Sequence, residues 1–149
     1  NQLQVNNGET IYWNGATFGA NQEAYVTLNT LNMSADEIDL LLKGQGTYWG
    51  DGILEIWYRP TLGVIQVMTY EISHGWVQHG ADISVTFATG DRFGARAKVD
   101  GTVEVYQNNT LLGTRDITAW SYYANGGYIG LWMINASGTI VDDFGGGNS

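Results

Sequence analysis

Hydrophobic and polar side chains alternate with a period of two along most of this chain, and no helical period persists beyond one turn. Residues 34–37 have the composition of a helix start, with Ser34 as N-cap and Glu37 three positions later. The apolar run 38–42 behind them is instead typical of a buried strand. Glycines recur at intervals typical of strand-to-strand turns. Short strands with regular turns predict an all-β fold, an antiparallel two-sheet sandwich.

The segment around Pro60 predicts a hairpin with a defined register. Residues 60–63 (PTLG) provide a four-residue loop, which sets Arg59 opposite Val64 and Trp57 opposite Gln66. Alternation then gives the hairpin two faces. The predicted core face comprises Leu54, Ile56, Tyr58, Ile65, Val67 and Thr69. The predicted outer face comprises Glu55, Trp57, Arg59, Gln66, Met68 and Tyr70.

The segment around Gly101 predicts a second hairpin, for which two registers exist. A two-residue turn pairs Lys98 with Val103 and mixes cations with core residues on one face. A three-residue loop with Gly101 in the left-handed conformation removes this conflict, because it pairs Arg96 with Glu104. Since a one-residue slip moves every side chain to the other face, we predict the second register.

Five motifs in the second half of the chain are typical of one known fold. They are DISVTFA (82–88), GDRFGAR (90–96), DGTVEVY (100–106), YIGLW (128–132) and DDFGGG (142–147). Together they resemble the concanavalin A-like, laminin-G-like jelly rolls of secreted multidomain proteins, and the resemblance covers about residues 23–147. It implies a two-sheet jelly roll that serves in lectins, carbohydrate-binding modules, glycosidases, lyases and adhesion domains. Because many functions share this fold, the fold alone does not identify the function. The function must be argued from a site.

Length and charge restrict the possibilities further. The 149 residues predict a single domain, 1–149, with 145–149 as a flexible tail. The net charge of -9 argues against binding to nucleic acid or to an anionic membrane, and no apolar run is long enough to insert into a bilayer. The chain begins at Asn1 without a signal segment, so we expect a processed module that is secreted or at the cell surface and tethered to other domains.

The composition favours a sugar-binding surface. Aromatic residues make up 13% of the chain, with 6 tryptophans and 9 tyrosines, whereas charged residues make up only 14%. A surface poor in charge and rich in aromatic and small polar side chains suits an extracellular polysaccharide or other glycan as partner. The sugar rings would stack on the aromatic faces, while polar side chains would take the hydroxyl groups.

The candidate ligand-binding residues follow from strand alternation. Four of the 6 lysines and arginines fall on one predicted outer face, which indicates a cationic, aromatic groove. Such a groove suits an acidic glycan, because arginine pairs with carboxylate or sulfate. The candidates are Trp57, Arg59, Gln66, Tyr70, Arg92, Arg96 and Tyr106, with Trp49 and Trp76 at the rim. The alternative is a solvated sheet face with cross-strand ion pairs such as Arg96 with Glu104.

Other aromatic residues are assigned by their segments. Trp120 lies in a loop-like segment with Tyr122, where it would either contact a ligand or plug the end of the sandwich. Trp132 and Phe144 lie in strands of core composition, and we predict them to be core residues.

An enzymatic function is disfavoured by a missing carboxylate. Family 16 glycoside hydrolases share the jelly roll and carry three carboxylates on one strand face. Glu37 and Asp39 match the first two, but the third position is Leu41 or Leu42, which cannot donate a proton. We therefore expect no hydrolase.

A polysaccharide lyase stays an open alternative. The Gln-x-His of alginate lyases is absent, because Met68 stands two residues after Gln66. His74 and His79 with Tyr70 and Arg92 would then have to supply the base and the charge neutraliser. A second alternative is a structural or adhesion module that binds protein.

No cofactor motif is present, and we expect no cofactor beyond a structural calcium. The candidate ligands are Asp142, Asp143 and Glu23, because jelly rolls of this kind sometimes hold calcium through carboxylates and backbone carbonyls.

Overall fold

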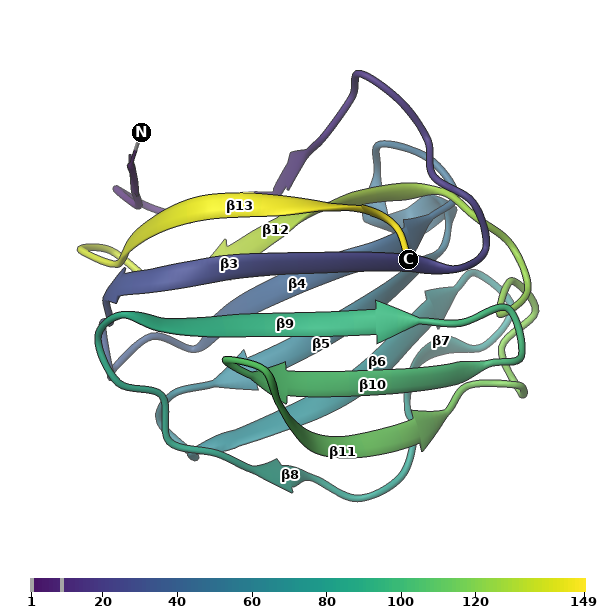
Figure 1. Ribbon diagram of the computed structural model, residues 1–149. Coiled ribbons are helices and arrows are strands. Elements are labelled where there is room, and N and C mark those ends of the chain that lie inside the picture. Colours follow the sequence, from purple (N-terminus) through teal and green to yellow (C-terminus); the bar gives the residue numbers. More distant parts are fainter. Residues whose placement is uncertain (1, 9) are drawn as a thin grey trace.

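Two antiparallel β-sheets packed face to face make up the protein, as a computed structural model shows for residues 2–8 and 10–149 (Figure 1). Sheet A has six strands in the order β1-β13-β3-β9-β10-β11. Their bounds are β1 Leu3–Gln4, β3 Gln22–Thr30, β9 Asp91–Ala97, β10 Thr102–Gln107, β11 Thr110–Asp116 and β13 Ile140–Asn148.

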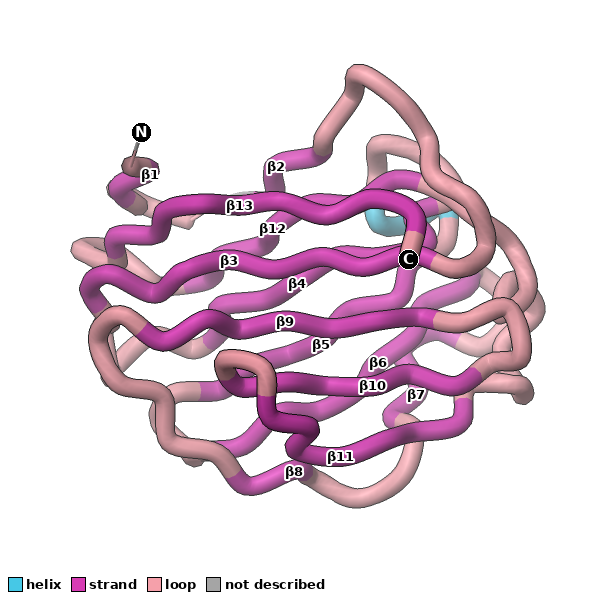
Figure 2. The backbone as a smooth tube through the Cα atoms, in the orientation of Figure 1, coloured by secondary structure: helices cyan, strands magenta, loops and turns pink. Residues whose placement is uncertain are grey.

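Sheet B has seven strands, with the order β2-β12-β4-β5-β6-β7 and β8 paired to β6. Their bounds are β2 Thr10–Tyr12, β4 Glu37–Gly44, β5 Ile53–Arg59, β6 Val64–Glu71, β7 Gly75–Gln78, β8 Ile83–Ser84 and β12 Tyr128–Ile134. A short 3-10 turn, η1 Trp49–Asp51, is the only helical segment of the described chain (Figure 2). No helix in the described residues has the length and apolar character needed to cross a membrane.

Both predicted hairpin registers are confirmed. Arg59 pairs with Val64 and Trp57 with Gln66 across β5 and β6. Arg96 pairs with Glu104 across β9 and β10, and Gly101 has a φ of 87° in the turn between them. The left-handed conformation of this glycine therefore sets the register that keeps the cations out of the core.

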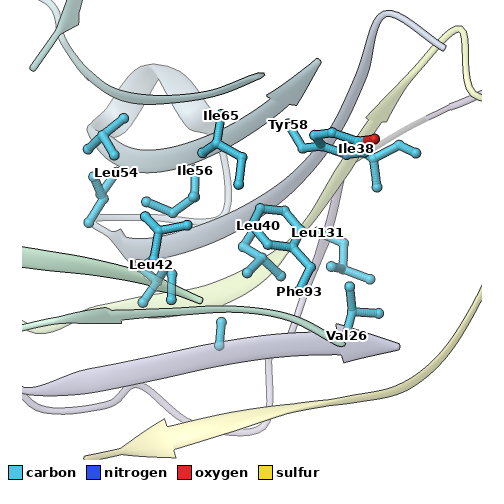
Figure 3. Packing of buried hydrophobic residues seen from close by; sticks show 14 of the residues in the cluster. Val26, Ile38, Leu40, Leu42, Leu54, Ile56, Tyr58, Ile65, Phe93 and Leu131 are labelled. Atoms are coloured by element: carbon cyan, nitrogen blue, oxygen red, sulfur yellow. The ribbon is translucent and has the colours of Figure 1, made fainter. Parts of the chain in front are cut away.

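The hydrophobic core lies between the sheets and takes alternate residues from each strand. Ile38 and Leu40 on β4 and Ile56 on β5 lie on the side of sheet B that faces Val26 on β3 and Phe93 on β9 (Figure 3). All five side chains are fully buried, and each contributes about 1.5–3 kcal/mol to folding. The same alternation turns every second residue outward, so each sheet presents an outer face.

Lys43, near the end of β4, is fully buried although it is a cation. Its Nζ donates hydrogen bonds to the carbonyl oxygens of Ala20 (2.6 Å) and Asn125 (2.9 Å), and its backbone N–H donates to Oε1 of Gln22 (2.7 Å). Burial lowers the pKa of Lys43 to about 8. The side chain thus joins the segments before β3 and before β12 to the end of sheet B.

The C-terminal glycines form part of a strand, so the expectation of a flexible tail over 145–149 is wrong for residues 145–148. Gly145 pairs with Tyr25 and Gly147 with Glu23, as β13 runs antiparallel to β3. A β-carbon at Gly146 would collide with the carbonyl oxygen of Glu23. The glycines are thus needed for the close approach of two strands, which composition alone does not distinguish from flexibility.

We expect Gly146→Ala to lower the free energy of unfolding by about 2 kcal/mol, because β13 must move away from β3 to admit the methyl group. Urea denaturation measures the change. Gly90→Ala is the matched control, since Gly90 has a φ of 91° but nothing within 4 Å of an added β-carbon. An equal loss in both variants would show that backbone strain, and not the strand contact, sets the cost.

Candidate functional site

The two outer faces of the sandwich separate residues that the sequence analysis placed together. Sheet B carries Trp57, Arg59, Gln66 and Tyr70, whereas sheet A carries Arg92, Arg96 and Tyr106. Figure 1 shows the two sheets as separate layers, and the core lies between them, so outer residues of sheet A and of sheet B lie on opposite sides of the molecule. The prediction of one continuous binding face is therefore wrong. Alternation holds within each hairpin, but it does not tell which sheet the hairpin joins.

Cross-strand pairing arranges the outer residues of sheet B in rows. One row is Trp132, Asp39, Trp57 and Gln66, on β12, β4, β5 and β6. The next row is Gly130, Leu41, Glu55, Met68 and Gln78, which continues onto β7. Asp39 thus lies between two tryptophans, and Glu55 is its diagonal neighbour on the adjacent strand.

Five aromatic side chains cover this part of sheet B, and we name them the aromatic cluster: Trp49, Trp57, Tyr70, Trp76 and Trp132. Trp76 stacks on Trp57 with ring centroids 5.9 Å apart and on Trp49 at 5.8 Å. Trp49 also stacks on Trp132 at 6.1 Å. Because Trp49 comes from η1 and Trp76 from the short edge strand β7, peripheral elements close over the centre of the sheet.

Three carboxyl groups lie on the same face of sheet B. Glu37, Asp39 and Glu55, named here the carboxyl trio, each contribute an oxygen within 4.8 Å of the others. Asp39 is 0% exposed and Glu55 is 1% exposed. Burial raises the pKa of Glu55 to about 8, and burial with the nearby Glu55 charge holds the pKa of Asp39 well above its ordinary value. Both groups thus favour the protonated form.

Buried polar atoms concentrate on this face. They include Tyr12 Oη, the carboxyl oxygens of Asp39 and Glu55, Trp57 Nε1 and Arg59 Nε. The protonated carboxyls of Asp39 and Glu55 hydrogen-bond to each other, and Glu37 hydrogen-bonds to Trp57. Tyr12 Oη and Arg59 Nε have no partner among the described residues, so this polar set is only partly satisfied by the protein itself.

The third carboxylate that the sequence motif lacks is present in space. Leu41 follows Glu37 and Asp39 on β4, and Glu55 pairs with Leu41 from β5. Sequence reasoning placed Glu55 on an outer face but did not bring it to Asp39, because the β4–β5 register crosses a loop of irregular structure. Asp39 and Glu55 are buried in this conformation, on the face that carries the aromatic cluster, so they form no open acid–base pair.

The residues considered for a lyase are dispersed. His79 is buried with its ring bonded to Thr69 Oγ1 (2.7 Å), and Thr69 belongs to the core side of β6. His74 lies in the turn before β7, where its Nδ1 is 2.7 Å from Glu71 Oε1. Arg92 lies on sheet A. The proposed base and charge neutraliser therefore do not converge.

The candidate calcium ligands do not converge either. Glu23 pairs with Arg96 (2.9 Å) and lies opposite Gly147, whereas Asp142 lies opposite Thr27, four residues farther along β3. Within the described residues, only the carboxyl trio brings three potential metal ligands together. The calcium site suggested by the resemblance does not fit these residues.

Two tryptophans occupy places other than expected. Trp132, predicted as core, lies on the outer face within the aromatic cluster, because Leu131 and Met133 on either side of it face the core. Trp120 is 2% exposed and its Nε1 donates to the carbonyl oxygen of Tyr70 (3.1 Å), so it plugs the sandwich. Strict alternation from Leu131 would have placed Trp132 on the outer face.

Solved structures share this architecture. Sheep galectin-11, solved with glycerol, aligns with a TM-score of 0.61 at 10% identity over 96% of this chain and 99% of that one. Congerin II with lactose and MES gives 0.62 at 16% identity, covering 93% and 99%. Chicken galectin 2 gives 0.57 at 15%, covering 85% and 88%. No protein-family model and no curated protein matches the sequence.

Likeness at such identities shows the fold alone. The protein has the concanavalin A-like lectin fold, a jelly roll of two antiparallel sheets, as the sequence resemblance implied.

Proposed function

We propose that this protein is a non-catalytic carbohydrate-binding module that binds sugar on the outer face of sheet B. The concentration of buried, partly satisfied polar groups beside the aromatic cluster carries the proposal. A sugar presents hydroxyl groups that donate to carboxylates and accept from indole and guanidinium N–H groups, while its C–H face packs on aromatic rings. Asp39, Glu55, Trp57 Nε1 and Arg59 Nε offer both kinds of partner in one place.

The charge of this face favours a neutral sugar. The carboxyl trio opposes a single nearby cation, Arg59, whose guanidinium lies 5.6 Å from the Trp57 ring centroid. A uronate or sulfate placed here would bring a negative charge next to three carboxyl groups, two of which are already hard to ionise because they are buried. This would make its binding unfavourable. The acidic glycan expected from the clustered cations therefore does not suit sheet B.

Access to the face requires a side-chain movement. The oxygens of Asp39 and Glu55 have almost no exposed surface. Trp76 stacks on Trp57 and Trp49 stacks on Trp132 on the same face, and both Trp49 and Trp76 belong to peripheral elements, η1 and a four-residue edge strand. We propose that a sugar ring replaces one of these indoles over the carboxyl trio. The aromatic-rich, charge-poor composition supports an extracellular setting for such a module.

We expect Trp57→Ala to weaken binding of a neutral oligosaccharide by about 2 kcal/mol, or roughly thirtyfold, because Trp57 supplies both a stacking face and an indole N–H. Isothermal titration calorimetry against a panel of neutral oligosaccharides measures the effect. Trp13→Ala is the matched control, since Trp13 is 55% exposed and lies outside the aromatic cluster. Equal affinity of wild type and Trp57→Ala for a bound neutral sugar would reject sheet B as the site.

A further inference from the structure

The outer face of sheet A carries a hollow of about 460 Å³ that the proposed sugar site does not use. Three rows of neighbouring residues surround it on β3, β9, β10 and the turn that follows β10. The rows are Glu23, Arg96 and Glu104; then Tyr25, Gly94 and Tyr106; then Thr27, Arg92 and Asn108, the last of which accepts from the Arg92 backbone N–H. Gly94 is at the centre of this lattice, with a tyrosine on each side and an arginine two residues away in each direction.

Gly94 leaves the hollow open without being required by the backbone. A β-carbon at this position would lie 3.6 Å from Tyr25 Cβ and 3.9 Å from Tyr106 Cβ, which are ordinary contacts. Its φ is not in the left-handed region, so other residues fit the strand. Glycine inside a strand lowers stability and often marks a place where another molecule approaches closely. We interpret Gly94 as the floor of a binding site.

The cations of this face lie along one strand. Arg92, Arg96 and Lys98 are three of the 6 lysines and arginines in a chain of net charge -9. Arg96 bonds through Nε to Glu23 (2.9 Å), and Lys98 bonds to Glu104 (2.5 Å), which also accepts from the Tyr106 hydroxyl. Arg92 has no ion-pair partner among the described residues, and its guanidinium carbon lies 3.5 Å from the Tyr25 ring centroid.

The stacking leaves the hydrogen-bonding edge of Arg92 free. The Tyr25 ring lies against the guanidinium, so the group is held in place while its N–H groups have no carboxylate partner among residues 2–8 and 10–149. A guanidinium held in this way matches the fork geometry of a carboxylate or a sulfate. Of the charged residues lining the central hollow, Arg92 and Arg96 outnumber Glu23, which leaves one net positive charge.

Two further hollows continue the central one along the sheet. One shares Glu23, Arg96 and Tyr106 with it and extends to Lys98 and Glu104, and the other shares Tyr25 and Arg92 and extends to Asp143 and Phe144. Three cations thus face three carboxylates over the three hollows, and the positive excess is confined to the central one. From Arg92 to Lys98 the strand advances about 20 Å. The three hollows form a groove, named here the sheet A groove, that is long enough for several sugar units.

We propose that the sheet A groove is a second binding site, which takes an acidic polysaccharide through its carboxylate or sulfate groups. An anionic group pairs with the free edge of Arg92, the sugar ring lies over Gly94 between Tyr25 and Tyr106, and the next anionic group approaches Arg96. The site is independent of the proposed neutral-sugar site, because the two lie on opposite sheets.

A polysaccharide fits this groove better than an acidic peptide does. Extended peptides bind sheets mainly by adding a strand at an edge, where backbone groups are free. The groove lies over β3, β9 and β10, which are interior strands of sheet A with neighbours on both sides. A ligand on these strands therefore contacts side chains and not backbone groups. The tyrosine rings suit the C–H face of a sugar, and the arginine guanidinium groups suit its carboxylate or sulfate.

The test compares ligands that differ only in charge. Wild-type protein is titrated with an oligogalacturonate, with its neutral methyl ester, with a sulfated oligosaccharide and with poly-glutamate. We expect binding of the oligogalacturonate, the sulfated oligosaccharide or both, and none of the methyl ester. Arg92→Gln and Gly94→Val should each weaken that binding at least tenfold, the first by removing the free donor edge and the second by filling the floor.

Two control variants separate this site from other causes. Arg115→Gln removes the same charge on β11 outside the groove, and Trp57→Ala disables the proposed neutral-sugar site; both should bind the acidic ligand as wild type does. Circular dichroism and the melting temperature test whether Gly94→Val is folded. Absence of acidic-sugar binding by wild type, unchanged binding in Arg92→Gln, or equal Arg92-dependent binding of poly-glutamate would overturn the proposal. Neutral-sugar binding that depends on Trp57 would survive each of these outcomes.

Discussion

The free energy of unfolding should fall by about 5 kcal/mol as the pH rises from about 4.5 to about 8, because Glu55 ionises in the unfolded chain but stays protonated in the folded protein. Its pKa is about 8 in the fold and 4.5 when unfolded, so between these values the folded state binds more protons than the unfolded state. Stability that depends on the protonated carboxyl is complete below pH 4.5 and lost as the pH approaches 8. Asp39, whose pKa is also raised by burial, acts in the same direction.

Two other buried groups, His79 and Lys43, also affect how the free energy of unfolding varies with pH. Burial lowers the pKa of His79, so this group costs stability only as the pH falls below 6.5. Burial also lowers the pKa of Lys43 from 10.5 to about 8, so above pH 8 the unfolded state binds more protons at this group and its contribution to stability rises. The window from pH 6.5 to 8 therefore isolates the carboxyl groups, and above pH 8 Lys43 opposes any further decrease from Asp39.

Glu55→Gln tests the origin of this slope. The variant has no ionisable group at position 55, so the decrease between pH 6.5 and 8 should become about half as steep in urea denaturation at a series of pH values, because buried Asp39 still contributes. Glu71→Gln is the control, because hydrogen bonding from Ser121 lowers the pKa of Glu71 and gives it no role in this window. A slope as steep in Glu55→Gln as in wild type would assign the effect to other groups.

Replacing Trp120 by alanine should lower the free energy of unfolding by about 4 kcal/mol. The indole is 2% exposed and belongs to the core, so its removal leaves a large cavity at one end of the sandwich. It also leaves the carbonyl oxygen of Tyr70 without its donor. Chemical denaturation of wild type and variant at one pH gives the difference.

Two comparisons separate packing from hydrogen bonding at this position. Trp120→Phe keeps part of the ring volume but loses the N–H donor, so we expect an intermediate loss. Trp13→Ala removes an indole that is 55% exposed, and it should change stability by less than about 0.5 kcal/mol. A loss below about 1 kcal/mol in Trp120→Ala would contradict the assignment of Trp120 as a plug.

The hairpin registers could be predicted from sequence because local rules determine them. The loop 60–63 and the left-handed Gly101 each select one pairing, and a slip would have buried cations. The sheet that each hairpin joins could not be predicted in this way. β9 pairs with β3, more than 60 residues earlier in the chain, and no local rule specifies such a pairing.

The candidate site was predicted in parts for the same reason. Outer positions such as Glu55 and Trp57 followed from alternation, but their assembly with Asp39 and Trp132 depends on the order β12-β4-β5 in sheet B. Asp39 appeared in the sequence only as part of an incomplete enzyme motif. The side chains were therefore identified as polar or aromatic surface, whereas their convergence into one buried set follows only from the structure.

The arrangement of the sheets has a consequence for assembly. The aromatic cluster and the sheet A groove point away from each other across a single core. If both bind as proposed, a lone copy of the domain is bivalent and connects two polymer strands of different charge. Such a molecule would crosslink a mixed extracellular matrix without forming a dimer, and tandem copies would convert the crosslinks into a network.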